Sequence, residues 1–416
     1  MSESTQDTRH PLEKLRDPGT VRARCRAVLR AVDSNVSEHF RLDRGALPAV
    51  AERVAALTLQ RFPDLRIPYH SRWRHFEAGG VDRKPVLDAL LATASLAEAA
   101  RTRFDLTVVS VLLDAGAGPD WKYTEDGGGV YVRSEGLGVA SWHAFLRGVF
   151  SSSAAEPLRA DAAALEKVDS AALRSVFQAS PSNPMVGLEG RAGLLQRLGA
   201  ALRKEGGAGA RPALLFDRLT RHGMATETSA TQILGELLRT LGPIWTSGSQ
   251  VQGLPAGDVW PHRWAGAACG DGSEDPTTAG WVPFHKLSQW LSYSLLEPLQ
   301  WAGIGVTGLD ALSGLPEYRN GGLLLDAGVL VPRDPRSLAK TWKPKDDFII
   351  EWRACTVALL DEVAVLVRQR LGRSAEELPL ACILEGGTWA AGRQIAGEKR
   401  PGGVPPLKID SDGTVF

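Results

Sequence analysis

The sequence predicts a mainly α-helical fold with a small β-sheet near residues 105–133. Over most of the 416 residues, apolar side chains recur every three or four positions, which is the spacing of one helix face. Capping residues, prolines or glycines bound many of these segments, whereas β-rich runs are few. The composition, 44% hydrophobic and 23% charged, is that of an ordinary globular protein.

The expected helices follow one another along the chain. Thr20 is expected to cap the first of them, and Pro85 to occupy the first turn of another. Ser134 and Asp169 stand where the caps of two further helices belong, and a helix over 186–206 ends at a glycine pair. We expect further amphipathic helices to begin near Thr228, Phe284, Glu351 and Ser374.

The other segments are strand-like or irregular. The β-rich run 105–116 predicts a strand, and the glycines before Val130 predict a hairpin turn into a second strand. Two polar stretches rich in glycine and proline, 247–257 and 268–280, are typical of loops within a fold.

One domain is expected. We expect residues 1–19 to be flexible and 20–416 to form a single two-lobed domain, with the tail 397–416 packed on its surface. Lys plus Arg and Asp plus Glu both number 48, and this neutral balance argues against a nucleic-acid partner.

The sequence has neither a signal peptide nor a membrane-spanning segment, and this bears on the compartment of the protein. The polar N-terminus has no signal-peptide core, and no apolar run is long enough to span a bilayer. We therefore expect a cytoplasmic protein without membrane association. No two cysteines form a C-x-x-C pair, which is typical of reduced thiols; the four are Cys25, Cys269, Cys355 and Cys382.

A basic and aromatic cluster lies in "YHSRWRHFEAGG". Arg72 and Arg74 are candidate anchors for a phosphate or carboxylate, with Trp73 and His75 as neighbouring binding residues. The alternative is an exposed basic segment beside a glycine turn, and the residues alone leave both open.

Further candidates come from the ends of expected elements. Asp114 ends the expected strand before a glycine loop that leads to Trp121, and such carboxylates are ligand contacts about as often as turn residues. His285 and Gln289 share one helix face with Lys286 adjacent, which indicates either one side of a site or a solvated face.

Two later helices add polar side chains. Glu351 and Arg353 lie on opposite sides of an expected helix start. Glu385, Trp389 and Arg393, at i, i+4 and i+8, share one face, which is as consistent with solvent-exposed pairing as with binding.

The segment "SGLPEYRNGGLLLDAG" groups four polar residues between glycines. Glu317, Tyr318, Arg319 and Asn320 follow Gly314 and precede a glycine pair, which we interpret as a loop. A turn with a local ion pair is the plain interpretation, and a loop that brings a carboxylate to a substrate is the functional one.

Metal and cofactor signatures are absent from the sequence. The eight histidines form neither H-x-x-x-H nor H-E-x-x-H, and no G-x-x-x-x-G-K-[ST] occurs. We therefore expect neither a metal nor a cofactor.

Several quoted segments together resemble one family. "RWRHFEAGGVDR", "DAGAGPDWKY", "NPMVGLEGR", "FHKLSQWLSYSLLEP" and "GLPEYRNGGLLLDAGVL" are similar to the uracil catabolism protein 4 family, over nearly the whole chain from about residue 20. That resemblance implies a place in a pathway that degrades uracil through a ribosylated intermediate and releases urea.

A more distant resemblance concerns the chemistry. Residues 284–289, 317–322 and 351–353 are similar to the F-Y-K-x-A-Q, D-Y-R-[VI]-P-Q and E-I-R segments of the queuosine salvage family, which hydrolyses an N-glycosidic bond on a helical scaffold like that of DNA glycosylases. His285 replaces the family's tyrosine and Glu317 its aspartate, so the leaving group is not carried over.

The two resemblances imply an N-ribosyl hydrolase. Glu317 would stabilise the positive C1′ and steer water, with Asp114 and Glu351 as further catalytic carboxylates. Arg319 would hold Glu317 ionised, while Lys286, Arg72 and Arg74 would converge on a phosphate. The expected partner is a small phosphorylated ribosyl substrate, such as a ribosylurea 5′-phosphate.

Two other functions stay open at this stage. One is a metal-dependent amidohydrolase that attacks the ureido carbonyl, which chelator sensitivity would reveal. The other is a nucleotide-binding scaffold without turnover.

Overall fold

The computed structural model describes residues 11–114, 116–245, 249–268 and 277–410. Helices dominate these residues, which confirms the mainly α fold class. They are α1 (Pro11–Leu15), α2 (Pro18–Asp33), α3 (Leu47–Arg61), α4 (Arg72–His75), α5 (Lys84–Leu90), α6 (Leu96–Leu112), α7 (Arg133–Leu146), α8 (Ala162–Leu165), α9 (Ser170–Val176), α10 (Leu188–Gly206), α11 (Leu214–Leu219), α12 (Ala230–Leu241), α13 (Lys286–Trp301), α14 (Tyr318–Asp326), α15 (Asp347–Leu371), α16 (Leu380–Ile383) and α17 (Trp389–Lys399).

The strands are short and, within the described residues, join only in pairs. Two pairs are parallel and the others antiparallel. The parallel pairs are β4 (Glu227–Ser229) with β9 (Gly305–Thr307) and β11 (Thr341–Trp342) with β12 (Lys408–Ile409). The antiparallel pairs are β1 (Phe40–Leu42) with β10 (Leu330–Pro332), β2 (Lys122–Thr124) with β3 (Val130–Val132), β5 (Ser249–Val251) with β6 (Leu254–Gly257) and β7 (Val259–Pro261) with β8 (Trp281–Pro283).

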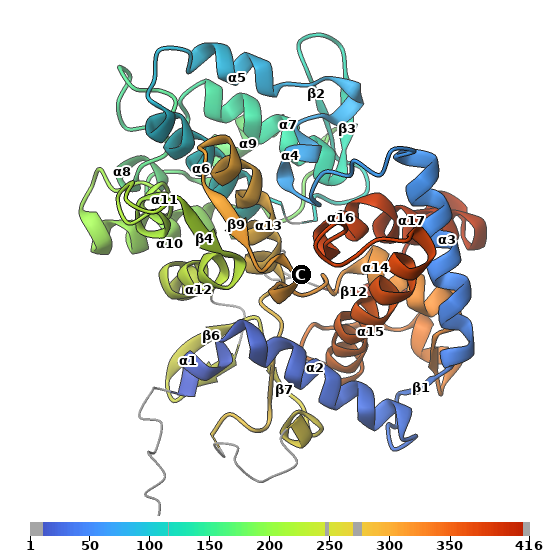
Figure 1. The fold of residues 1–416 in the computed structure, drawn as a ribbon. Helices are drawn as coiled ribbons and strands as arrows, with labels where there is room; N and C mark the ends of the chain where they lie inside the picture. Colours follow the sequence, from blue (N-terminus) through green and yellow to red (C-terminus); the bar gives the residue numbers. More distant parts are fainter. Residues whose placement is uncertain (1–10, 115, 246–248, 269–276, 411–416) are drawn as a thin grey trace, which may run out of the picture.

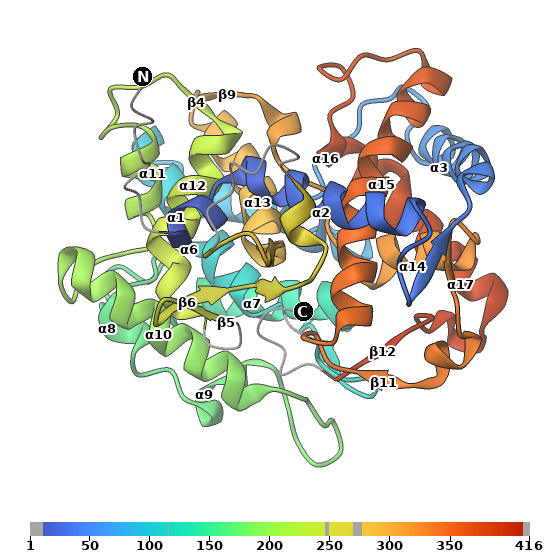
Figure 2. The same ribbon diagram turned by 90° about the horizontal axis from the view of Figure 1, so that it is seen from below.

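The helices form two groups on either side of α13. Figure 1 shows α5–α12, from the middle of the chain, on one side, and α3 with α14–α17 on the other. The view from below in Figure 2 shows α2 passing between the groups and lying along α15. Residues from distant parts of the chain therefore meet around α13.

The run at 105–116 is not a strand. Residues 105–112 belong to α6, and every side chain from Thr102 to Leu112 is buried. A helix enclosed on all sides shows no apolar stripe, so its β-branched residues resemble a buried strand in the sequence. The small sheet expected in this region is reduced to the β2–β3 hairpin.

The helix caps agree only in part with the sequence prediction. Asp169 caps α9 as expected, accepting from the backbone of Ala172 at 2.7 Å. Asp17 rather than Thr20 caps α2, because the helix begins one turn earlier at a proline. Ser134 lies inside the first turn of α7 rather than at its cap.

The ends of the described chain are packed. Leu12 and Leu15 of α1 are buried, within the stretch expected to be flexible, and Leu407 is buried beside β12. Among the cysteines, Cys269 lies outside the described residues, and the other three are buried free thiols. No helix in the described part of the chain is both long and apolar enough to traverse a bilayer.

The polar segment expected to be a loop opens a helix instead. Gly321 and Gly322 lie in the first turns of α14, where a Cβ on Gly321 would come within 2.3 Å of the Trp352 ring. On α17, a Cβ on Gly392 would come within 2.1 Å of the Arg319 carbonyl oxygen. The glycines therefore let α14 approach α15 and α17 closely.

Replacing Gly392 with alanine should destabilise the fold. The added methyl meets backbone, which cannot swing aside, so we expect the free energy of unfolding to fall by about 1–3 kcal/mol. Gly397→Ala, in the same helix with nothing within 4 Å of its would-be Cβ, is the matched control. It should be neutral or stabilise by up to about 1 kcal/mol. Equal urea denaturation midpoints for both variants would refute this account of the helix contact.

Candidate functional site

The start of α13 is fixed by an acidic residue that the sequence analysis did not single out. The Asp258 carboxylate accepts the backbone N–H of Lys286 at 3.0 Å, and its carbonyl oxygen accepts that of Phe284 at 2.9 Å. His285 is held between them at a left-handed φ of 47°, an uncommon backbone state for a residue with a side chain. These contacts determine where the Lys286 side chain begins.

Asp258 is in turn held by a buried arginine. Both Nη atoms of Arg353 donate to its two carboxylate oxygens at 2.7 Å, and the Trp260 indole donates at 2.7 Å. Burial alone would raise the pKa of Asp258, yet Arg353 and these hydrogen bonds hold it below its usual value. Asp258 is therefore an ionised carboxylate inside the protein.

The charges of four residues act on Lys286. Its pKa is lowered, first by burial and then by the charge of Arg353, while Glu317, Asp258 and Asp114 act in the opposite direction. We call these five residues the lysine cluster. It brings together Asp114, Lys286 and Glu317, three residues proposed from the sequence, from three separate parts of the chain.

Glu317 is the N-cap of α14. Its carboxylate accepts the backbone N–H groups of Arg319 and Asn320, each at 2.7 Å, at the positive end of the helix dipole. Sequence reasoning assigned the stabilisation of this carboxylate to the Arg319 guanidinium. That group instead donates to the carbonyl oxygen of Gly403 at 2.9 Å. The Glu317 carboxylate is therefore held in place by backbone N–H groups.

Asp114 is tied to a fully buried arginine. Arg72 opens α4 and donates to Asp114 at 2.9 Å, to Nδ1 of His75 at 2.9 Å and to Ser110 at 2.6 Å. Its second terminal nitrogen, Nη2, has no hydrogen-bond partner among the described residues. Burial and the charge of Arg72 lower the pKa of His75 to about 4, so this imidazole is neutral near pH 7 and its Nδ1 accepts.

A second basic group lies beside Glu317. Burial lowers the pKa of Arg319, Glu317 raises it, and the like charges of Arg133 and Arg393 lower it further. Arg393 also approaches Glu135 of α7 at 3.6 Å, which links the two groups of helices. Three guanidinium groups that repel one another are a favourable place for an anion.

Arg74 does not join Arg72 and Lys286. It donates to Glu77 at 2.9 Å and to Glu297 at 2.6 Å. Glu297 is eleven residues beyond Lys286 on α13, which is about 16 Å along a helix. The expectation that three cations converge is therefore wrong for Arg74, because its side chain leaves the opposite side of α4 from Arg72.

Glu351 is also separate from the lysine cluster. It is fully buried, accepts a hydrogen bond from Ser37 and lies 3.7 Å from Nε2 of His262. Burial raises the pKa of Glu351 to about 7, and burial lowers the pKa of His262 to about 4. Because Glu351 and Arg353 leave opposite sides of α15, only Arg353 reaches Lys286.

Several predicted binding residues are structural. Trp73 and Trp121 are buried, and their indoles donate to carbonyl oxygens of neighbouring segments. Nε2 of His285 lies 2.9 Å from the carbonyl oxygen of Leu15, and Gln289 accepts the backbone N–H of Ser313 at 3.1 Å. These contacts account for the burial of Trp73, Trp121 and His285, whereas the buried Nε2 of Gln289 has no hydrogen-bond partner among the described residues.

Two predicted residues of α14 point toward neighbouring segments. Asn320 is buried and donates to the carbonyl oxygen of Leu315 at 3.1 Å. The Tyr318 hydroxyl donates to the carbonyl oxygen of Ile409 at 3.5 Å. Asn320 and Tyr318 therefore anchor the start of α14 from two sides.

The expected face of Glu385, Trp389 and Arg393 is interrupted. Residues Leu384–Thr388 form a π-helical turn between α16 and α17, which places more residues in one turn and rotates Glu385 away. Glu385 contacts Nδ1 of His70 at 2.9 Å, whereas Arg393 lies over the Trp389 ring at 5.6 Å. Of this set, Arg393 is the residue whose charge acts on Arg319.

The sequence analysis missed Asp258 and Glu135. Asp258 directly follows a stretch interpreted as a loop, and Glu135 lies inside a helix start, so neither carried a spacing signal. Among the described residues, no three histidine, cysteine or acidic side chains are grouped so that they could hold a metal ion.

Comparison with known proteins identifies full-length relatives. Residues 14–416 match a family model described as "Protein of unknown function (DUF1688)". Protein urg3 of Schizosaccharomyces pombe is 39% identical over 411 residues, which cover 97% of this chain and 98% of that protein. Uracil catabolism protein 4 of Lachancea kluyveri is 35% identical over 441 residues, covering 98% and 99%. These matches confirm the resemblance to the uracil catabolism protein 4 family.

Glu351 and His262 should oppose each other in the pH dependence of stability. The raised pKa of Glu351 gives stability that is lost as pH rises from 4.5 through about 7. The lowered pKa of His262 gives stability that grows as pH rises from about 4 to 6.5.

Single variants should separate the two effects. For Glu351→Gln, the free energy of unfolding should rise with pH between about 4.5 and 6.5, because His262 still titrates. For His262→Asn it should fall with pH, by up to about 3 kcal/mol. Urea denaturation at several pH values measures both slopes, and slopes of the same sign would contradict the assignment.

Proposed function

This chain belongs to the DUF1688 family, and we propose that it is an N-glycosidase of uracil catabolism. The proposed substrate is a ribosylurea 5′-phosphate, a ring-opened uracil nucleotide, and the products are urea and ribose 5-phosphate. The pathway is inferred from the name of the Lachancea kluyveri relative. The reaction is inferred from the lysine cluster.

The feature that carries the proposal is the lysine cluster, in which the backbone N–H of Lys286 is held by Asp258 and the charges of Asp114 and Glu317 act on its side chain, whose pKa burial and Arg353 lower. Hydrolysis breaks the bond between C1′ and the urea nitrogen, and the bonding electrons leave with that nitrogen. Lys286 has the chemistry to protonate it, because a lowered pKa makes its ammonium a stronger acid. Glu317, held in place by backbone donors, stabilises the positive charge that develops at C1′.

Water completes the reaction at C1′. Its oxygen forms the new C–O bond, and its proton passes to a carboxylate of the cluster. Asp114 suits this role because Arg72 orients it and His75, being neutral, adds no competing charge. The proton balance closes when Lys286 regains a proton from that carboxylate.

The substrate phosphate requires its own anchor. Arg319, Arg393 and Arg133 supply three positive charges beside Glu317, on the side where α7 faces α14 and α17. A phosphate there would relieve the repulsion among the three guanidinium groups. In the proposed complex, the ribose lies between the phosphate anchor and Lys286.

A product assay tests the proposed reaction. Purified protein incubated with a ribosylurea 5′-phosphate should release urea and ribose 5-phosphate in equal amounts, with and without a chelator. Release of ammonia and carbon dioxide that stops on chelation would instead indicate an amidohydrolase. Absence of turnover with retained ligand binding would indicate a scaffold, and either result overturns the proposal.

Glu317→Gln should separate catalysis from binding. The amide keeps the shape and one acceptor oxygen but loses the charge, so turnover should fall by roughly 10²–10³. Affinity for ribose 5-phosphate should weaken by less than about tenfold, since the carbocation exists only in the transition state.

A second helix cap provides the control for folding effects. Asp169→Ala removes the cap of α9 at a cost of about 1 kcal/mol in stability. It should leave turnover unchanged, because α9 contributes no residue to the lysine cluster. Turnover near that of the wild type in Glu317→Gln would remove Glu317 from the catalytic role.

A further inference from the structure

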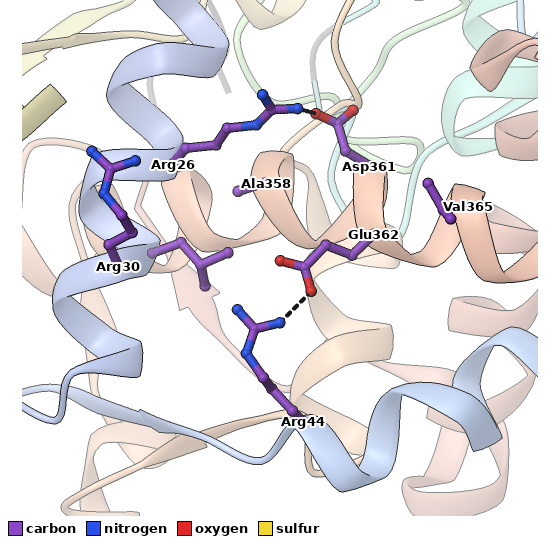
Figure 3. Close-up of a pocket in the computed structure, with 8 residues that line it drawn as sticks. Arg26, Arg30, Arg44, Ala358, Asp361, Glu362 and Val365 are labelled. Atoms are coloured by element: carbon purple, nitrogen blue, oxygen red, sulfur yellow. Dashed lines mark hydrogen bonds and ion pairs between the residues drawn. The ribbon is translucent and has the colours of Figure 1, made fainter. Parts of the chain in front are cut away.

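A groove outside the lysine cluster runs between α2 and α15. It consists of two adjoining hollows, of about 310 and 250 Å³, that share Arg26, Asp361 and Val365. Figure 3 shows the first hollow, with Arg26 reaching from α2 to Asp361 and Arg44 reaching from the opposite side to Glu362. The larger volume is at the lower end of the range of small-molecule sites.

The floor of the groove is apolar. Leu29 of α2 and Ala358 of α15 line the first hollow, and Ala364 and Leu380 line the second. Val365 lies in both hollows and is 50% exposed. A ligand with a flat apolar part would cover this exposed surface.

The rim of the groove carries more positive than negative charge. Its carboxylates are Asp310, Asp361 and Glu362. Its guanidinium groups are those of Arg22, Arg26, Arg30, Arg44 and Arg368. Arg44 also pairs with Asp33, which does not line the groove, so these five guanidinium groups face four carboxylates and the local excess is one positive charge in a chain that is neutral as a whole.

Arg26 can turn to a ligand at little cost. Asp361 is bound by Arg22 through two bonds of 2.9 and 3.1 Å, whereas Arg26 contributes a single bond of 3.2 Å and its side chain is 57% exposed. If Arg26 moved to an anion, Asp361 would keep its stronger partner. Arg26 is therefore available to donate to another acceptor.

We propose that this groove binds a phosphorylated small molecule with a flat ring, of the size of a mononucleotide. The phosphate is bound by Arg26 and Arg30, one helical turn apart on α2, and the ring covers Val365. The site is independent of the proposed reaction, because none of its residues belongs to the lysine cluster.

The groove also touches the segment that leads to Glu317. Arg22 donates to the carbonyl oxygens of Asp310 and Leu312, the latter at 2.6 Å, and Asp310 accepts from Arg368 at 2.9 Å. Four residues separate Leu312 from Glu317 along the chain. A ligand that redistributes these arginines thus acts close to the cap of α14.

Calorimetric titration with uridine 5′-monophosphate tests the site. Arg26→Gln combined with Arg30→Gln should weaken binding at the groove by at least about tenfold, which is about 1.4 kcal/mol. The matched control replaces Arg53 and Arg370 with glutamine, which makes the same change in net charge at ion pairs outside the groove. That control should bind within about twofold of the wild type, an effect near RT ln 2.

Titration of Lys286→Met locates the binding. Nucleotide affinity that persists in Lys286→Met and falls in the groove variant supports the proposal. The reverse pattern would assign the nucleotide to the lysine cluster, and equal affinity in all variants, or no binding, would also overturn it. Inorganic phosphate and uridine, titrated separately, should each bind more weakly than the nucleotide; phosphate binding as tightly would show that the apolar floor has no role.

Discussion

The buried pair of Asp258 and Arg353 is the interaction on which the site depends. It joins the turn between β6 and β7, the start of α13 and the first turns of α15, three segments far apart in the chain. A buried ion pair contributes little net stability, but removal of one partner leaves an unpaired charge at a cost of about 3–5 kcal/mol. The pair therefore acts mainly on geometry, because it fixes the backbone of Lys286 while Arg353 also lowers the pKa of the Lys286 side chain.

Charge is distributed unevenly in a chain whose net charge is zero. Most exposed arginines are paired with carboxylates along the surface, where a pair is worth roughly 0–1 kcal/mol. The pairs of Arg72 with Asp114 and of Arg353 with Asp258 are buried, where the low dielectric strengthens every interaction. Asp114, Asp258 and Arg353 all act on the pKa of Lys286, so both buried pairs contribute charge to the surroundings of one amine.

The sequence predicted features that depend on local chemistry. The β2–β3 hairpin, the cap of α9 and the glycine end of α10 follow from turn and cap residues, and the structure has all three. The strand expected within 105–116 is absent because residues 105–112 belong to α6, and a helix buried on every side has no apolar stripe. The glycines after Asn320 were misread because Gly321 lies against Trp352 and Gly322 against Pro406, two residues that are distant in sequence.

The candidate site, like the fold, could be predicted from the sequence only in part. Residue type and position led to Lys286, Glu317, Arg72 and Asp114, and resemblance to other proteins supplied the roles expected of them. The same reasoning failed for Glu351 and Arg74, since side-chain direction depends on the packing of each helix. Asp258 had no signal in spacing or composition, because its role exists only once β7, α13 and α15 are assembled.

The contact between α14 and α17 has a mechanical consequence. Where one backbone rests directly on another, with no side chain between them, the joint can neither slide nor roll without collision. Glu317, Arg319 and Arg393 are thus carried on one stiff frame, whereas Glu135 belongs to the opposite body. Any opening between the two bodies must stretch the 3.6 Å link from Arg393 to Glu135, while the spacing within the frame is preserved. The two groups of helices can therefore open and close around a small substrate while the distances from the Glu317 carboxylate to Arg319 and Arg393 stay the same.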